Sequence, residues 1–72
     1  MTIVFEDHGQ DFTEWRLDGR GKVVECVPFQ GSVWKGIQVL GARHLNAGDR
    51  VTIRTRSGEV RHVNYRITEV RR

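Results

Sequence analysis

The chain has 72 residues and a formal net charge of +3 at pH 7. This length allows one domain, so residues 1–72 are expected to form a single small β domain of marginal stability. No apolar run approaches the 18 residues of a membrane-spanning helix and no secretory leader is visible, which argues against a membrane or secreted protein and favours a cytoplasmic one.

The residue types favour strands over helices. The chain contains ten Val, four Ile and five Thr, but only three Leu and two Ala. β-Branched residues suit a pleated sheet, and the strongest helix formers are scarce. Glycine-containing turns divide the chain at short intervals. We therefore expect an all-β fold, a small antiparallel barrel or strongly bent sheet of five to six strands, with an SH3-like barrel as the leading form.

The first half of the chain predicts three strands, at residues 2–6, 12–17 and 22–27. Pairing Leu17 with Lys22 across the turn "DGRG" directs Trp15 toward the core. The same register sets Glu14 against Glu25, which like charges disfavour. Pro28 lacks an amide proton, so it should end the third strand or mark a sheet edge.

The stretch "FQGSVWKG" predicts a turn that leads into a fourth strand at residues 33–40. A short helical turn capped by Ser32 is the alternative, although few residues follow before Gly36. "NAGD" then forms a turn into the fifth strand, and Leu45 is expected to close one end of the core.

The last two strands, at residues 50–55 and 59–69, should form a hairpin. A three-residue loop at 56–58, with Gly58 in the left-handed region, is a common hairpin connection. In that register Val51 faces Val63. Only this register places the apolar side chains on one face, and a slip of one residue would separate them. The inward set is Val51, Ile53, Val63, Tyr65 and Ile67.

Charge is divided unevenly along the chain. Residues 1–36 carry six carboxylates and four basic side chains, a net charge of −2, whereas residues 37–72 carry three carboxylates and eight arginines, a net charge of +5. Such an imbalance indicates an anionic partner or a head-to-tail contact between copies.

The outward face of the hairpin supplies the candidate binding site. Arginine binds phosphate through a planar fork of donors, and aromatic rings can stack on unpaired bases. Phe12 and Trp34 fall out of phase with their apolar neighbours, so they are the rings expected at the surface. The predicted nucleic-acid-binding residues are Arg50, Arg54, Arg56, His62, Asn64, Arg66 and Trp34. The alternative is an ordinary solvated face of an antiparallel sheet.

Other chemistry has little support in the sequence. The three histidines are far apart and have no metal-ligand spacing, so no metal and no cofactor are expected. Cys26 is the only cysteine and has the apolar neighbours of a core residue. No catalytic motif is present, and the chain is not expected to be an enzyme.

These observations favour a small basic module that binds nucleic acid or is associated with it. The alternative is a protein–protein interaction or homo-oligomerising adaptor module without catalytic activity, with a homo-dimer as its simplest form. The first prediction requires free arginines. If Glu6, Asp7, Asp11 or Glu14 pair with them, the basic face is only an internal salt-bridge network.

Overall fold

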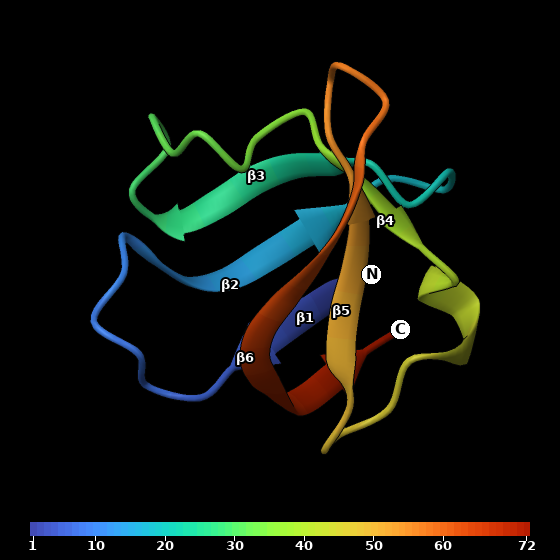
Figure 1. Ribbon diagram of the computed structural model, residues 1–72. Coiled ribbons are helices and arrows are strands. Elements are labelled where there is room, and N and C mark those ends of the chain that lie inside the picture. The colour runs from blue at the N-terminus through green and yellow to red at the C-terminus, as the bar shows by residue number, and fades with distance from the viewer.

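The computed structural model describes residues 1–72, which form one six-stranded antiparallel sheet without an α-helix (Figure 1). The elements in chain order are β1 (Thr2–Phe5), β2 (Phe12–Leu17), β3 (Val23–Pro28), β4 (Gln38–Leu40), the 3₁₀ turn η1 (Ala42–His44), β5 (Arg50–Arg54) and β6 (Val60–Arg71). The strands lie in the order β3-β2-β1-β6-β5-β4, so the first and last strands of the chain form the central pair. The predicted all-β fold is confirmed, as a strongly bent sheet that is not closed. No helix is long and apolar enough to cross a membrane.

The bend of the sheet follows β6, which pairs with β5 through its first half and with β1 through its second half. This curvature brings the two edges of the sheet together around a bridge between Lys22 and Gln38. There Val39 N donates to the Gly21 carbonyl at 2.9 Å. Beyond this bridge β3 is an edge strand that ends at Pro28, as expected from the missing amide proton.

The core lies in the concave side of the bent sheet and contains 14 buried apolar residues. Trp15 is its centre, fully buried, with its ring centroid 4.8 Å from that of Phe5 and 5.0 Å from that of Phe12. Leu45 is a buried member of this cluster.

The predicted register of the β5–β6 hairpin is confirmed. Val51 lies opposite Val63, and the three-residue loop is closed by a hydrogen bond of 2.8 Å from Thr55 N to the Glu59 carbonyl. Gly58 has a φ of 90°, the left-handed conformation that the loop requires. Four of the five residues predicted to face inward are buried and the fifth, Tyr65, is half-buried.

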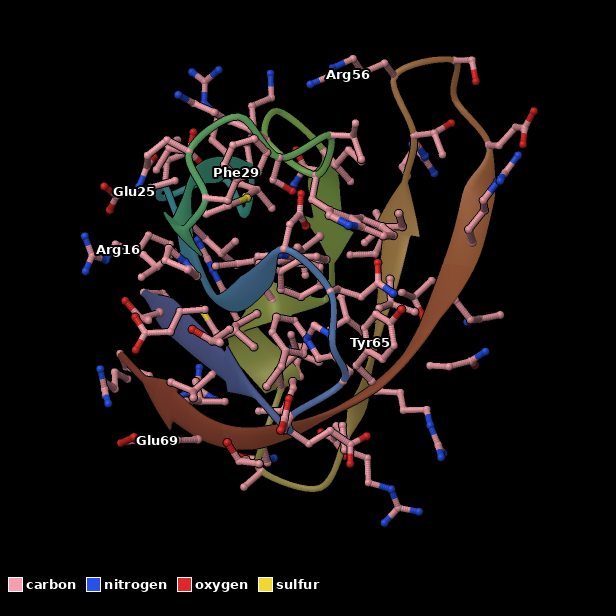
Figure 2. All side chains as sticks on the ribbon, turned by 90° about the vertical axis from the view of Figure 1, so that its left-hand side faces the viewer. Arg16, Glu25, Phe29, Arg56, Tyr65 and Glu69 are labelled. Atoms are coloured by element: carbon pink, nitrogen blue, oxygen red, sulfur yellow. The ribbon has the colours of Figure 1, made fainter.

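The predicted register of the β2–β3 hairpin is wrong. Arg16, not Glu14, lies opposite Glu25 and forms an ion pair with it (Figure 2). Two features change the register. The turn closes with a hydrogen bond of 2.9 Å from Asp18 N to the Lys22 carbonyl, which places Leu17 opposite Val23, and an extra residue in β3 at Val24 shifts the pairing once more and leaves the Val24 side chain exposed. Together they replace a repulsive contact with an attractive one.

The predicted start of the fourth strand at residue 33 is also wrong, because residues 33–36 form turns and β4 is short. Ser32 Oγ accepts a hydrogen bond of 3.3 Å from Trp34 N, so the alternative of a turn capped by Ser32 is closer to the structure. The turn directs Trp34 against the core, with its ring centroid 5.4 Å from that of Trp15. An extended segment would forfeit that contact.

The β2–β3 turn gives the molecule an acid-sensitive element. Asp18 Oδ1 accepts hydrogen bonds from Lys22 N at 3.0 Å and Arg20 N at 2.9 Å, and these two bonds lower the pKa of the carboxyl below its ordinary value. A lowered pKa means that the charged form stabilises the fold above about pH 4, and that this contribution disappears as the pH falls through the folded-state pKa.

Asp18→Asn should therefore lower the urea midpoint at pH 7, because the neutral amide is a weaker acceptor for the two backbone donors. Urea titrations at pH 7 and pH 2.5 test this: the difference between wild type and variant should shrink at the lower pH. A difference that is the same at both values would contradict the role of the charge.

Candidate functional site

Four exposed arginines of the β5–β6 hairpin, on its strands and in its loop, form no ion pair. Of the basic side chains, only those of Arg16, Arg61 and Arg71 form ion pairs. We call the remaining exposed set of the hairpin the arginine face, which consists of Arg50, Arg54, Arg56 and Arg66.

Local contacts position part of this face. Arg50 lies opposite Arg66, and Arg50 Nε donates to the Asn64 carbonyl at 3.3 Å. The Thr52 hydroxyl lies 3.1 Å from His62 Nδ1 on the neighbouring strand. The structure thus brings the predicted hairpin residues together on one surface.

The alternative of an internal salt-bridge network is wrong. Glu6, Asp7 and Asp11 form no ion pair, and Glu14 pairs with Arg71, 3.5 Å away, which lies outside the arginine face. Glu6 Oε1 accepts a hydrogen bond of 2.9 Å from the Arg66 backbone amide, so it approaches β6 without neutralising the guanidinium. No carboxylate of the chain neutralises the arginine face, in which Arg50 and Arg56 donate only to backbone carbonyls.

The aromatic part of the prediction is wrong. Phe12 is 1% exposed, and Trp34 is half-buried with its ring centroid 5.8 Å from that of Phe12. The prominently exposed ring is Phe29, at 54%, in the loop after β3, which the sequence analysis did not select (Figure 2). The sequence feature that indicates its exposure is its position directly after Pro28, where the strand ends and no partner strand can cover the ring.

A groove separates the hairpin from the turn that precedes β4, and we call it the hairpin groove. Its volume is about 420 Å³, and it is lined by Val33, Trp34, Ile37, Ile53, Thr55, Arg61, His62 and Val63. Arg56 extends from the hairpin tip and donates to the Lys35 carbonyl across the loop region (Figure 2). Val33 is 73% exposed at the rim, an unusual position for an apolar side chain without a partner.

Cys26 lies on β3 opposite Trp15 and is fully buried. Burial raises the pKa of its thiol, and a hydrogen bond with Ser32 opposes that shift only in part. A protonated and inaccessible thiol is a poor nucleophile, so Cys26 acts as a small core residue.

The arginine face, the hairpin groove and the strands that carry them fall within one segment that matches a known family. A family model described as "Mechanosensitive ion channel, beta-domain" matches residues 29–72, which is more than half of the chain. The chain belongs to this family. No curated protein and no solved structure matches it.

Membership in this beta-domain family overturns the predicted nucleic-acid-binding function, since the matched segment contains every residue assigned to that role. The burial of Phe12 and the half-buried position of Trp34 against it agree with the correction, because neither ring expected at the surface lies free for base stacking. The alternative prediction, an interaction or homo-oligomerising module, is closer to a channel beta-domain.

Proposed function

We propose that the chain is a self-associating beta-domain, whose copies contact one another within an assembly of the channel type. The observation that carries this proposal is the family match over the very segment that holds the unpaired arginine face and the open hairpin groove. The expectations that the chain is not an enzyme and is cytoplasmic remain predictions.

Charge supports contact between copies. The arginine face has no carboxylate partner within its own chain, and the carboxylates of Glu6, Asp7 and Asp11 have no basic partner. Two copies can neutralise both surfaces at once if the basic hairpin of one meets the acidic β1–β2 loop of the next. Complementary potentials of this kind direct association and determine its register.

Exposed apolar side chains support the same contact. Phe29, Val33 and Val60 are each more than half exposed, and Val33 lines the hairpin groove. Aromatic and apolar residues framed by arginine are the usual composition of a protein interface. Because the acidic and basic surfaces differ, the contact is heterologous, and repeated copies form a closed ring or an open filament.

Sedimentation velocity of the purified chain tests the proposal. We expect concentration-dependent association at low ionic strength that weakens as salt is raised, since salt screens exposed charges. Arg54→Glu combined with Arg66→Glu should weaken it at least about tenfold, equivalent to 1.4 kcal/mol. Neither side chain makes an internal hydrogen bond or ion pair, so the fold should be retained.

Arg43→Glu is the matched control, because Arg43 is also an exposed arginine without an ion pair but lies on η1, outside the arginine face. It should leave association nearly unchanged. A chain that stays monomeric at every concentration and salt level would overturn the proposal, as would an equal effect of the control substitution.

A further inference from the structure

A second groove lies between the β2–β3 turn and η1, and we call it the turn groove. Figure 1 shows both segments on the same side of the molecule, with β4 between them. Its volume is about 650 Å³, and it shares no lining residue with the hairpin groove. Self-association through the arginine face therefore does not account for it.

Side-chain hydrogen bonds fix both walls of the turn groove. On one wall, Gln38 Nε2 donates to the Arg20 carbonyl at 2.5 Å. On the other wall, Arg72 donates through Nη1 to the Arg43 carbonyl at 3.1 Å and through Nη2 to the Leu45 carbonyl at 2.5 Å. The walls are held in place before any ligand arrives, which reduces the entropy lost on binding.

The lining of the turn groove combines positive charge with an apolar floor. Arg20, Arg43 and His44 line it, and none of the three forms an ion pair. Asp18 is the only carboxylate of the lining, and its Oδ1 already accepts two hydrogen bonds from its own turn. The apolar part consists of Met1, Leu17, Val39, Leu40 and Ala42.

We propose that the turn groove binds a phosphate ester: its phosphate contacts the Arg20 and Arg43 guanidiniums, and its apolar group lies on the floor. Guanidinium groups bind phosphate through paired hydrogen bonds, and a protonated or neutral imidazole can add a donor. The volume is in the range of small-molecule sites and exceeds what inorganic phosphate fills, so the floor is available to an attached group.

A ligand of this chemistry has two sources, a soluble phosphate ester or the headgroup region of an anionic phospholipid. Amide chemical shifts of the ¹⁵N-labelled chain, titrated with inorganic phosphate and with hexyl phosphate, probe the first. Co-sedimentation with vesicles of phosphatidylglycerol, compared with phosphatidylcholine vesicles, probes the second. Binding to either probe supports the groove as a site, and a comparison of the two probes identifies the source of the ligand.

In the titrations with soluble phosphates, the changes in amide chemical shift should be concentrated at Arg20, Gly21, Arg43 and His44. Hexyl phosphate should bind at least about tenfold more tightly than inorganic phosphate, because its alkyl chain covers the apolar floor. Arg20→Gln with Arg43→Gln should weaken binding at least tenfold in whichever arm is positive. The control, Arg54→Gln with Arg66→Gln, removes the same charge from the arginine face and should have little effect.

The site is overturned if neither probe binds, if shifts spread evenly over all exposed arginines, or if the control variant weakens binding as much as the groove variant. These outcomes are independent of self-association, because the titrations are run at the dilution and salt where the chain is monomeric. Thermal melting of each variant verifies that it is folded, and the wild-type shift pattern locates the site without any substitution.

Discussion

Trp15→Ala is expected to remove a large part of the domain's free energy of unfolding at 25 °C. Trp15 is fully buried, and its ring contacts those of Phe5, Phe12 and Trp34 at centroid distances of 4.8, 5.0 and 5.4 Å. Replacing a buried tryptophan by alanine costs about 3–5 kcal/mol. A domain of this size has a total stability of only roughly 4–11 kcal/mol, so the substitution removes a large part of it.

Circular dichroism and urea titration measure this effect. Trp15→Phe should cost less than Trp15→Ala, since it retains most of the ring contacts and removes an indole Nε1 that is buried without a hydrogen-bond partner. Phe29→Ala is the control, because that ring is 54% exposed, and its cost should stay within about 0.5 kcal/mol. Equal losses for Trp15→Ala and Phe29→Ala would show that the aromatic cluster does not hold the core together.

Gly21→Ala is expected to produce the second large effect, at the point where the two edges of the sheet meet. Gly21 has a φ of 82°, which costs a residue with a Cβ about 1–2 kcal/mol. An added Cβ would lie 3.0 Å from both the Val39 carbonyl oxygen and Gln38 Nε2. Since Gly21 accepts the hydrogen bond from Val39 N, relief of this contact would separate the edge strands. Overpacking of this kind adds about 1–3 kcal/mol.

Gly58→Ala isolates the steric contribution. Gly58 has a φ of 90°, but an added Cβ there meets no atom within 4 Å. Its cost should be limited to the backbone conformation, and Gly21→Ala should exceed it by at least about 1 kcal/mol in urea titrations. If the two variants were equally stable, the structure around the Lys22–Gln38 bridge would accommodate the added Cβ at no measurable loss of unfolding free energy.

The sequence predicts elements whose alternation of side chains is uninterrupted. In the β5–β6 hairpin, only one loop length gathers the apolar residues on one face, and the structure has that register. In β2, an extra residue at Thr13 brings Phe12 and Trp15, three positions apart, to the same face of the sheet. Strict alternation assigns them to opposite faces, which is why Phe12 was expected at the surface.

Part of the candidate site also follows from the alternation of side chains in the sequence, and part depends on the fold. Parity along the hairpin places the arginines outside, and they lie there without ion pairs. Phosphate and carboxylate attract a guanidinium through the same fork of donors, however, so an arginine pattern does not distinguish nucleic acid from an acidic protein surface. The turn groove could not be predicted at all, because its lining residues come from segments far apart in the sequence that meet only where the Lys22–Gln38 bridge joins the edges of the sheet.

The central position of the terminal strands determines how the domain responds to tension. In the antiparallel β1–β6 ladder, Thr2 pairs with Arg71, so both ends of the chain leave the sheet at the same end of the ladder. A force that pulls Thr2 and Arg71 apart acts along the hydrogen bonds between the two strands, which are perpendicular to the strands, and breaks them one after another. A load along the strands would have to shear the whole ladder at once. Tension between Thr2 and Arg71 therefore meets less resistance than a load along the strands, and it opens the β1–β6 ladder while the Lys22–Gln38 bridge still joins the two edges of the sheet.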